Sequence, residues 1–398
     1  MMIINLIKKI ILICSTFNFK MLFRIFLISV LTIFLTSTLI KGGIKIFQGT
    51  EGQDFQYSPS KLFWEGTNHY EYILNKKDEL TNNKKIILSQ NGEYSHILYI
   101  IFYPFTLTDF ETAKKIWIAF NFLFAVLLPF VMGKYLKLRN TEILVSTLLF
   151  FASYPVKTTI GNGQQSLFIL LFYCIPFIFS SNFGALLAGI AYTKYNLGIS
   201  LFFYFLNNYK KLLISLIPSL FGWVFYCYYT NSNLIKNIFE MIQLTLTVTG
   251  RPESLFSFLN DISFIKQFKS NSLLIYLIEM IICLILILKI NKEIYNKFYK
   301  LALIALSAVT FFPHWGHDYV FLLPLALISY KNFYNLLGKI NIFFITYLIY
   351  LHGYIIRFFK LINFNFFEEF IMLATPKLLF LLLITNLFLY KKFKFINQ

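Results

Sequence analysis

Apolar stretches recur along almost the whole chain, and short clusters of lysine separate them. Of the 398 residues, 58% are hydrophobic and only 14% are charged, a composition typical of proteins that cross a membrane many times. A transmembrane helix needs roughly twenty apolar residues, so the apolar material suffices for about ten crossings. The sequence therefore predicts an all-α polytopic membrane protein in which residues 1–398 form a single integral membrane domain.

The strongly positive charge is explained by the membrane and not by nucleic acid. Lysine and arginine exceed aspartate and glutamate by 18. The lysines lie in short clusters between apolar runs, which is the pattern of cytoplasmic loops. This distribution predicts a multi-pass protein of the bacterial plasma membrane with both termini in the cytoplasm, and it excludes nucleic-acid binding.

The expected spans leave one long outer loop near the start. Residues 21–40 form the first span, and 41–112 form an extracytoplasmic loop whose stretch 96–107 is too short to cross and fits an interfacial helix. The remaining spans lie within 113–390. They are 113–133, 141–156, 165–180, 211–230, 271–290, 299–313, 318–330, 340–357 and 370–390.

Residues 183–206 decide the topology, because this stretch could cross once or fold back as two half-helices. A hairpin puts all the later lysine clusters inside, whereas a single crossing would not. We therefore expect a re-entrant hairpin whose broken backbone is buried among other helices. Lys194 would then lie near the membrane centre or face an external cavity, which indicates a binding site. The ordinary alternative is a lysine that extends to the membrane surface.

Polar segments interrupt the apolar pattern on the predicted outer side. Asp54 follows the first span, and 161–165 forms a polar hinge between two apolar runs. Residues His314, His317 and Asp318 put three ionisable groups within five positions at a span boundary. Counting the crossings puts this turn on the same side as Asp54, as a joint active site requires. The ordinary alternatives are a solvated interfacial carboxylate and an interfacial aromatic turn.

Together these groups suit the transfer of a group away from an anionic lipid phosphate. A carboxylate can take the acceptor proton, while Lys194, Arg251 or a histidine stabilises the leaving phosphate. Other chemistry is not indicated. The four cysteines have no CxxC spacing, and the turn 314–318 offers too few ligands to specify a metal. No Walker loop, GxGxxG motif or nucleophile elbow occurs.

Several motifs in order carry a resemblance to a known family. They are Asp54-Phe55 with Tyr57, Trp64-Glu65-Gly66 and Tyr70; Gly161-Asn162-Gly163-Gln164; Ala188-Gly189 through Lys194; and Pro313-His314-Trp315-Gly316-His317-Asp318. Arg251-Pro252-Glu253-Ser254-Leu255 is a weaker match. Over about residues 20–330, the chain resembles glycosyltransferase family 87, mannosyltransferase-like membrane proteins of the GT-C superfamily that use polyprenyl-phosphate sugars. His314 stands where that family often has Ser, Asp318 where it often has a second His, and Tyr195 where a small residue or Pro is expected.

The resemblance implies a GT-C-like bundle of about 10–12 helices and an inverting hexosyltransferase. It implies a hexose, such as mannose, moved from a polyprenyl-phosphate sugar to a lipid or glycan acceptor on the outer face. Asp54 would be the general base and His317 the second catalytic residue. The donor phosphate and sugar would be bound by Lys194, Gln164, His314, Asp318, Arg251 and Asn162. A monophosphate donor needs no divalent metal, so neither a metal nor another cofactor is expected.

Two other functions remain open from the sequence. A transporter or flippase of lipid-linked glycans would also use cations within a helical bundle, and inverted repeats would favour it. An O-antigen polymerase or ligase would be favoured by a large late outer loop rich in arginine, but 231–270 contains only Arg251.

Overall fold

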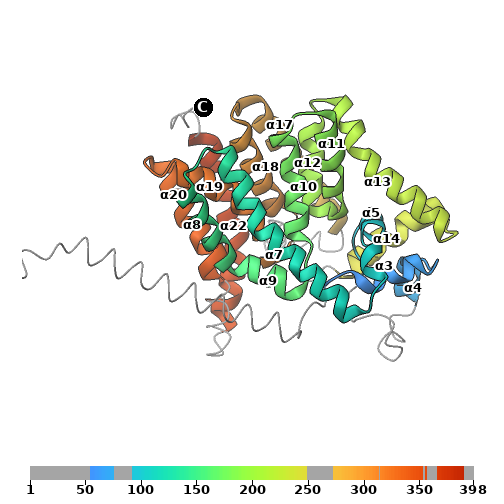
Figure 1. The fold of residues 1–398 in the computed structure, drawn as a ribbon. Coiled ribbons are helices and arrows are strands. Elements are labelled where there is room, and N and C mark those ends of the chain that lie inside the picture. Colours follow the sequence, from blue (N-terminus) through green and yellow to red (C-terminus); the bar gives the residue numbers. More distant parts are fainter. Residues whose placement is uncertain are drawn as a thin grey trace, which may run out of the picture. The chain divides into compact units, whose positions relative to one another are not determined.

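The computed structural model describes residues 54–75, 92–248, 272–312, 314–352, 355 and 365–389 (Figure 1). These residues belong to one compact unit, Gly49–Gln398. Within the described ranges the chain is helical throughout and contains no strand. The predicted all-α class is therefore confirmed for the described residues, while the predicted first span 21–40 and Arg251 lie outside them.

The helices follow one another with short connections, apart from the undescribed stretches. The first half contains α3 (Tyr57–Trp64), α4 (His69–Asn75), α5 (Ile97–Ile101), α6 (Tyr103–Thr106), α7 (Phe110–Tyr135), α8 (Asn140–Ala152), α9 (Tyr154–Asn162), α10 (Ser166–Ile178), α11 (Asn182–Ala188), the 3-10 helix η1 (Gly189–Thr193) and α12 (Tyr195–Phe205). The second half contains α13 (Tyr209–Tyr229), α14 (Leu234–Val248), α17 (Ser272–Glu293), α18 (Lys297–Phe311), the 3-10 helix η2 (Gly316–Leu322), α19 (Leu323–Lys331), α20 (Leu336–Thr346), the π-helical turn η3 (Tyr347–Leu351) and α22 (Asn365–Leu389).

Among the described residues, two helices are long and apolar enough to cross a membrane, namely α7 and α13. Helices α8 and α9 would form a third such element if the pair, bent by 59°, is one span. Other apolar helices are shorter: α10, which covers most of the expected span 165–180, has 13 residues. Residues 318–330, expected as one span, are divided between η2 and α19. The sequence predicts nine spans within 113–390, and the described residues of that stretch provide two or three helical elements that meet the length and composition of a span.

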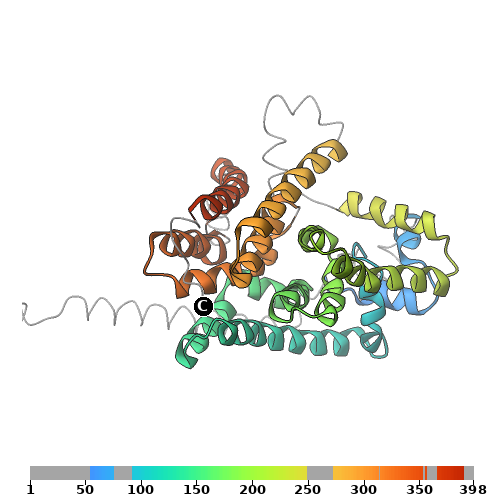
Figure 2. The same ribbon diagram turned by 90° about the horizontal axis from the view of Figure 1, so that it is seen from above.

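Helix α18 forms the centre of the packing. Every side chain from Phe298 to Phe311 is buried except the half-buried Lys300, as expected for a helix that is apolar all round. The helix contacts α10, α12, α17, α19 and α22, and it lies between these elements in the view from above (Figure 2). Two of its polar side chains, Ser307 and Thr310, are satisfied by carbonyl groups one turn earlier. Because α18 is fixed on all sides, the turn that follows it at residue 314 is held in a defined position.

Basic side chains gather at one end of these helices. Lys211 donates to the carbonyl of Ser180 over 2.8 Å, and Lys297 donates to the Ser180 hydroxyl over 2.9 Å. Lys331 donates to the carbonyl of Leu136 over 2.8 Å, at the turn between α7 and α8. The first two contacts join three turns that are far apart in sequence, and the third joins two more. The other ends of α10 and α18, which begin at Ser166 and finish at Phe311, therefore lie away from the lysines.

The chain reverses direction at Lys194. The backbone there leaves the helical region, with φ −105° and ψ 80°, between η1 and α12. Gly198 then lies directly against the segment before the break, because a Cβ at this position would be 2.8 Å from the Ala191 carbonyl oxygen and 2.9 Å from the Tyr192 Cα. Residues seven apart in a continuous α-helix would be about 10 Å apart along its axis. The stretch 182–205 is consequently a short hairpin with Lys194 at its tip (Figure 1).

Candidate active site

Five separate segments meet at the end of the bundle opposite the lysine clusters. Trp117 donates from its indole to the Gly163 carbonyl over 2.8 Å, and Gly163 has a φ of +71°, a conformation that favours glycine. This residue ends α9 and directs the chain into α10, so that Gln164, Gln165 and Ser166 lie at one corner. The other segments contribute Asp54, residues 92–95, Lys194 and the turn 314–318.

Asp54 is held by four hydrogen bonds, one of which its carbonyl accepts from the Gln56 side chain over 3.2 Å. Its amide donates to the carbonyl of Asn162 over 3.0 Å, and its own carbonyl accepts from the Gln165 side chain over 3.2 Å. The Gln164 amide donates to the carboxylate Oδ2 over 2.5 Å. Within the described part of the chain, the other carboxylate oxygen accepts no hydrogen bond, and the residue is only half-buried. One carboxylate oxygen is therefore held by Gln164, and the other can still accept a hydrogen bond.

The electrostatic surroundings keep Asp54 a stronger base than a solvated carboxylate. Burial raises its pKa, while the hydrogen bond from Gln164 and the charge of Lys194 oppose that rise. Asp318 adds a smaller raising effect. These interactions require both Lys194 and Asp318 to lie near Asp54.

Lys194 and Asp318 form a buried ion pair. Their Nζ and Oδ1 atoms are 2.5 Å apart; the Asp318 side chain is fully buried and the Lys194 side chain is 10% exposed. Ser166 donates its hydroxyl to the same carboxylate oxygen over 2.5 Å, and the amide of Trp315 donates to Oδ2 over 3.2 Å. Asp318 thus joins the tip of the hairpin, the start of α10 and the turn after α18. By holding both side chains, Asp318 positions the Lys194 ammonium beside the Ser166 hydroxyl.

The two histidines of the turn are buried and neutral. Burial lowers the pKa of His314 to about 4 and that of His317 to about 3. His314 contacts the Phe312 carbonyl through Nδ1 at 3.0 Å, so Nδ1 carries the proton and Nε2 is an acceptor. Within the described residues, Nε2 of His314 and Nε2 of His317 are buried without a hydrogen bond, and the latter lies 3.7 Å from Asp318. The Nε2 atom of His314 can therefore accept a hydrogen bond but cannot donate one.

Further residues at this site were missed by sequence reasoning. Glu93 is half-buried, and burial raises its pKa to about 7 against the opposing charge of Lys194. Tyr94 donates its hydroxyl to the Gln164 carbonyl oxygen over 3.1 Å, on the far side of the amide that binds Asp54. The amide of Ser95 donates to the Thr193 carbonyl over 2.9 Å. The sequence offered one signal, the acidic and aromatic pair 93–94 just before the short apolar run 96–107.

The expected site residues are therefore mostly together. Asp54, Gln164, Lys194, His314, His317 and Asp318 belong to one cluster, and Asn162 contributes its backbone carbonyl. Arg251 lies outside the described residues. No set of three His, Cys, Asp or Glu in the described ranges has the arrangement of a metal site.

Comparison with known proteins identifies no relative. No family model matches the chain, and neither a curated protein nor a solved structure does.

Proposed function

We propose that this protein is a membrane glycosyltransferase that moves a hexose, such as mannose, from a polyprenyl-phosphate sugar to an acceptor hydroxyl on the outer face of the membrane. The proposal rests on one observation above all. Polar residues from distant parts of an apolar chain converge on Asp54: Gln164 is bonded to its carboxylate, and Lys194 lies close enough to affect its pKa. The resemblance to glycosyltransferase family 87 links the same residues to one reaction.

The lysine distribution supports the orientation. Lys211, Lys297 and Lys331 lie at the end of the helices opposite Asp54. With that end in the cytoplasm, the candidate site faces the outside, both termini are cytoplasmic and the chain is a multi-pass protein of the bacterial plasma membrane. In this proposal α7, α13 and the shorter apolar helices belong to a GT-C-like bundle of about 10–12 helices.

The proposed transfer inverts the anomeric carbon. The acceptor hydroxyl approaches the Oδ1 atom of the Asp54 carboxylate, which takes its proton. The acceptor oxygen forms a bond to the anomeric carbon as the bond from that carbon to the phosphate oxygen breaks. The electron pair of the broken bond leaves with the polyprenyl phosphate. Gln164 holds the carboxylate in place throughout, because its amide bonds the opposite oxygen.

The donor phosphate would be met by Lys194 and Ser166 at the start of α10. Lys194 can stabilise the charge that develops on the leaving phosphate. Asp318 acts as a positioning residue, since its carboxylate is already taken up by Lys194, Ser166 and the amide of Trp315. The Nε2 atom of His314 would accept from a hydroxyl of the donor sugar, and His317 would lie beside the phosphate.

A donor comparison tests this proposal. Membranes that contain the protein are supplied with radiolabelled mannose, glucose or galactose, each carried either on polyprenyl monophosphate or on a nucleotide. We expect at least one polyprenyl-phosphate hexose to yield a labelled product while its nucleotide counterpart does not. Movement of lipid-linked glycan across proteoliposomes without any new glycosidic bond would instead support the transporter function.

A further inference from the structure

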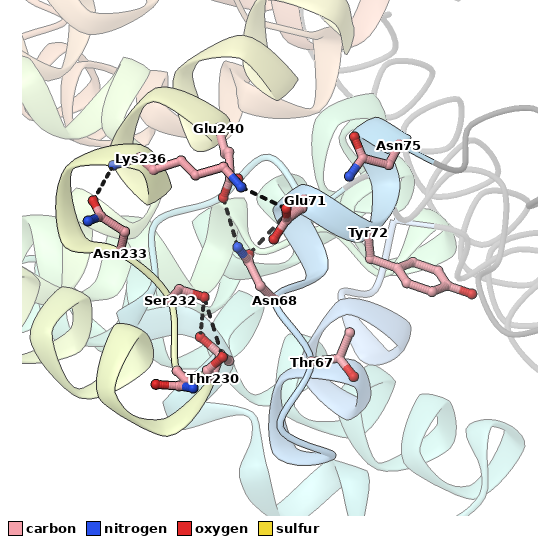
Figure 3. Close-up of a pocket in the computed structure, with 11 residues that line it drawn as sticks. Thr67, Asn68, Glu71, Tyr72, Asn75, Thr230, Ser232, Asn233, Lys236 and Glu240 are labelled. Carbon is pink, nitrogen blue, oxygen red and sulfur yellow. Dashed lines mark hydrogen bonds and ion pairs between the residues drawn. The ribbon is translucent and has the colours of Figure 1, made fainter.

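A polar cavity is lined by residues outside the candidate active site. It has a volume of about 440 Å³, within the range of small-molecule sites, and it opens between α4 and the turn that joins α13 to α14 (Figure 3). Helix α13 begins beside the lysine end and runs 21 residues, about 31 Å, to this turn. The cavity is therefore at the same end of the molecule as Asp54.

The lining of the cavity is unusual for so apolar a chain. All 11 lining residues have polar or charged side chains, including Asn68, Asn233 and the aromatic Tyr72. No aliphatic residue is among them, and every lining side chain carries a group that can form hydrogen bonds. The single cation, Lys236, contacts both carboxylates of the lining, Glu71 at 2.7 Å and Glu240 at 3.3 Å. The lining has a net charge of −1, and this charge disfavours a phosphate or another anion.

The polar groups are also fixed in advance. Asn68 is buried, donates to Glu240 over 2.7 Å and accepts from the hydroxyl of Tyr226 over 3.2 Å. Asn233 accepts from the amides of Ile235 and Lys236 at the start of α14. Preorganised amide and carboxylate groups with one aromatic side chain suit a ligand that offers many hydroxyl groups.

The cavity shares a wall with the candidate active site. Helix α4, which lines the cavity with Glu71 and Tyr72, also carries Tyr70, whose hydroxyl donates to the Tyr94 carbonyl over 2.7 Å. Tyr94 in turn bonds Gln164, the partner of Asp54. The cavity and the candidate active site are therefore linked by α4 and by hydrogen bonds between buried side chains.

We propose that the acceptor is an oligosaccharide and that its sugars behind the reacting one occupy this cavity. This inference rests on the proposed glycosyl transfer and names its acceptor class. Hydroxyl groups of the inner sugars bind Asn68, Glu71 and Asn233, and a sugar ring packs against Tyr72.

Binding and transfer measured with the same ligands test the proposal. The full-length protein in nanodiscs is titrated with octyl glycosides of single hexoses and of linear trisaccharides of mannose, glucose, galactose and N-acetylglucosamine, with octyl phosphate as an anionic probe. Asn75, an exposed residue of the lining, is replaced in Asn75→Trp to fill the cavity. Glu65→Trp, at an exposed position outside it, is the matched control.

At least one trisaccharide should bind about tenfold or more tightly than its monosaccharide, and Asn75→Trp alone should remove that preference. Transfer to the trisaccharide should then show a raised KM in Asn75→Trp with kcat unchanged. Equal binding of all trisaccharides and monosaccharides, an unaffected Asn75→Trp variant, or tighter binding of octyl phosphate would overturn the inference. Transfer to a monosaccharide acceptor with no trisaccharide preference would leave the proposed function standing alone, whereas cavity-dependent binding without any transfer would overturn the proposed function.

Discussion

The buried ion pair between Lys194 and Asp318 should dominate the stability of the candidate site. The structure gives a contact of 2.5 Å between a fully buried carboxylate and an ammonium whose side chain is 10% exposed. Removing one partner of such a pair leaves the other charge uncompensated, which destabilises a protein by about 3–5 kcal/mol. We expect Lys194→Met to reach this range, because Asp318 has no access to water.

Replacing Asp318 should destabilise the protein less than replacing Lys194. In Asp318→Asn the side-chain oxygen can still accept from Ser166 or the Trp315 amide, and Lys194 keeps partial contact with solvent. We expect a loss of about 1–3 kcal/mol in the free energy of unfolding. In the double variant neither charge remains, so its loss should be smaller than the sum of the single losses by about 2–3 kcal/mol.

The assay is unfolding of the purified protein by SDS from a mild detergent, followed by tryptophan fluorescence. The exposed pair of Lys236 and Glu71, with the similar separation of 2.7 Å, is the matched control. Its double-mutant cycle should show no measurable coupling, because water and salt screen it. Additive losses at Lys194 and Asp318, within about 0.5 kcal/mol, would refute the buried pair.

Three further outcomes follow from the same geometry. Burial raises the pKa of Glu93 to about 7, so this carboxyl becomes charged as pH rises through neutrality and then repels an anionic donor. In a pH-rate profile, transfer by the wild type should therefore fall more steeply above pH 7 than transfer by Glu93→Gln. The proposed role of Lys194 at the leaving phosphate predicts equal transfer rates with and without EDTA; a loss that Mg²⁺ or Mn²⁺ restores would contradict this role. Gly198→Val should destabilise the protein by about 1–3 kcal/mol in SDS unfolding, because its Cβ would meet the Ala191 carbonyl and the Tyr192 Cα. A loss no larger than that of Gly133→Ala, whose new Cβ meets only the Ile143 side chain, would argue against the tight hairpin.

The sequence predicted the helical class and most of the candidate site for a clear physical reason. Lys194 and Asp318 are ionisable groups that interrupt apolar stretches, so their positions stand out in the sequence, whereas Asp54 is singled out by its place after the first apolar span. Counting crossings put the turn 314–318 on the side of Asp54, and the structure brings the two within electrostatic range.

The sequence could not show which side chains within the site contact each other. Lys194 and Asp318 are 124 positions apart, and composition does not reveal which carboxylate a lysine will contact. Asp318 was therefore expected at the phosphate, whereas it holds Lys194. Glu93 was missed because it is one of several acidic residues in the loop 41–112.

The hydropathy pattern also could not predict where each helix begins and ends. Apolar runs show where a segment is buried but not where its backbone turns. Gly163, with its positive φ, ends α9, and Ser181 caps the start of α11 by accepting from the Gly184 amide. These local features shorten α10 to 13 residues, whereas the apolar pattern predicts a span over 165–180.

Asp54 is the proposed general base of the glycosyl transfer. The most direct measurement is transfer of radiolabelled mannose from polyprenyl-phosphate mannose in membranes that contain equal amounts of wild type, Asp54→Asn or the control Asp109→Asn. Asp109 caps α7 at an exposed position, and asparagine preserves such a cap. We expect Asp109→Asn to equal the wild type and Asp54→Asn to lose transfer by a factor of about 100 or more. Equal transfer by Asp54→Asn and the wild type would contradict the account.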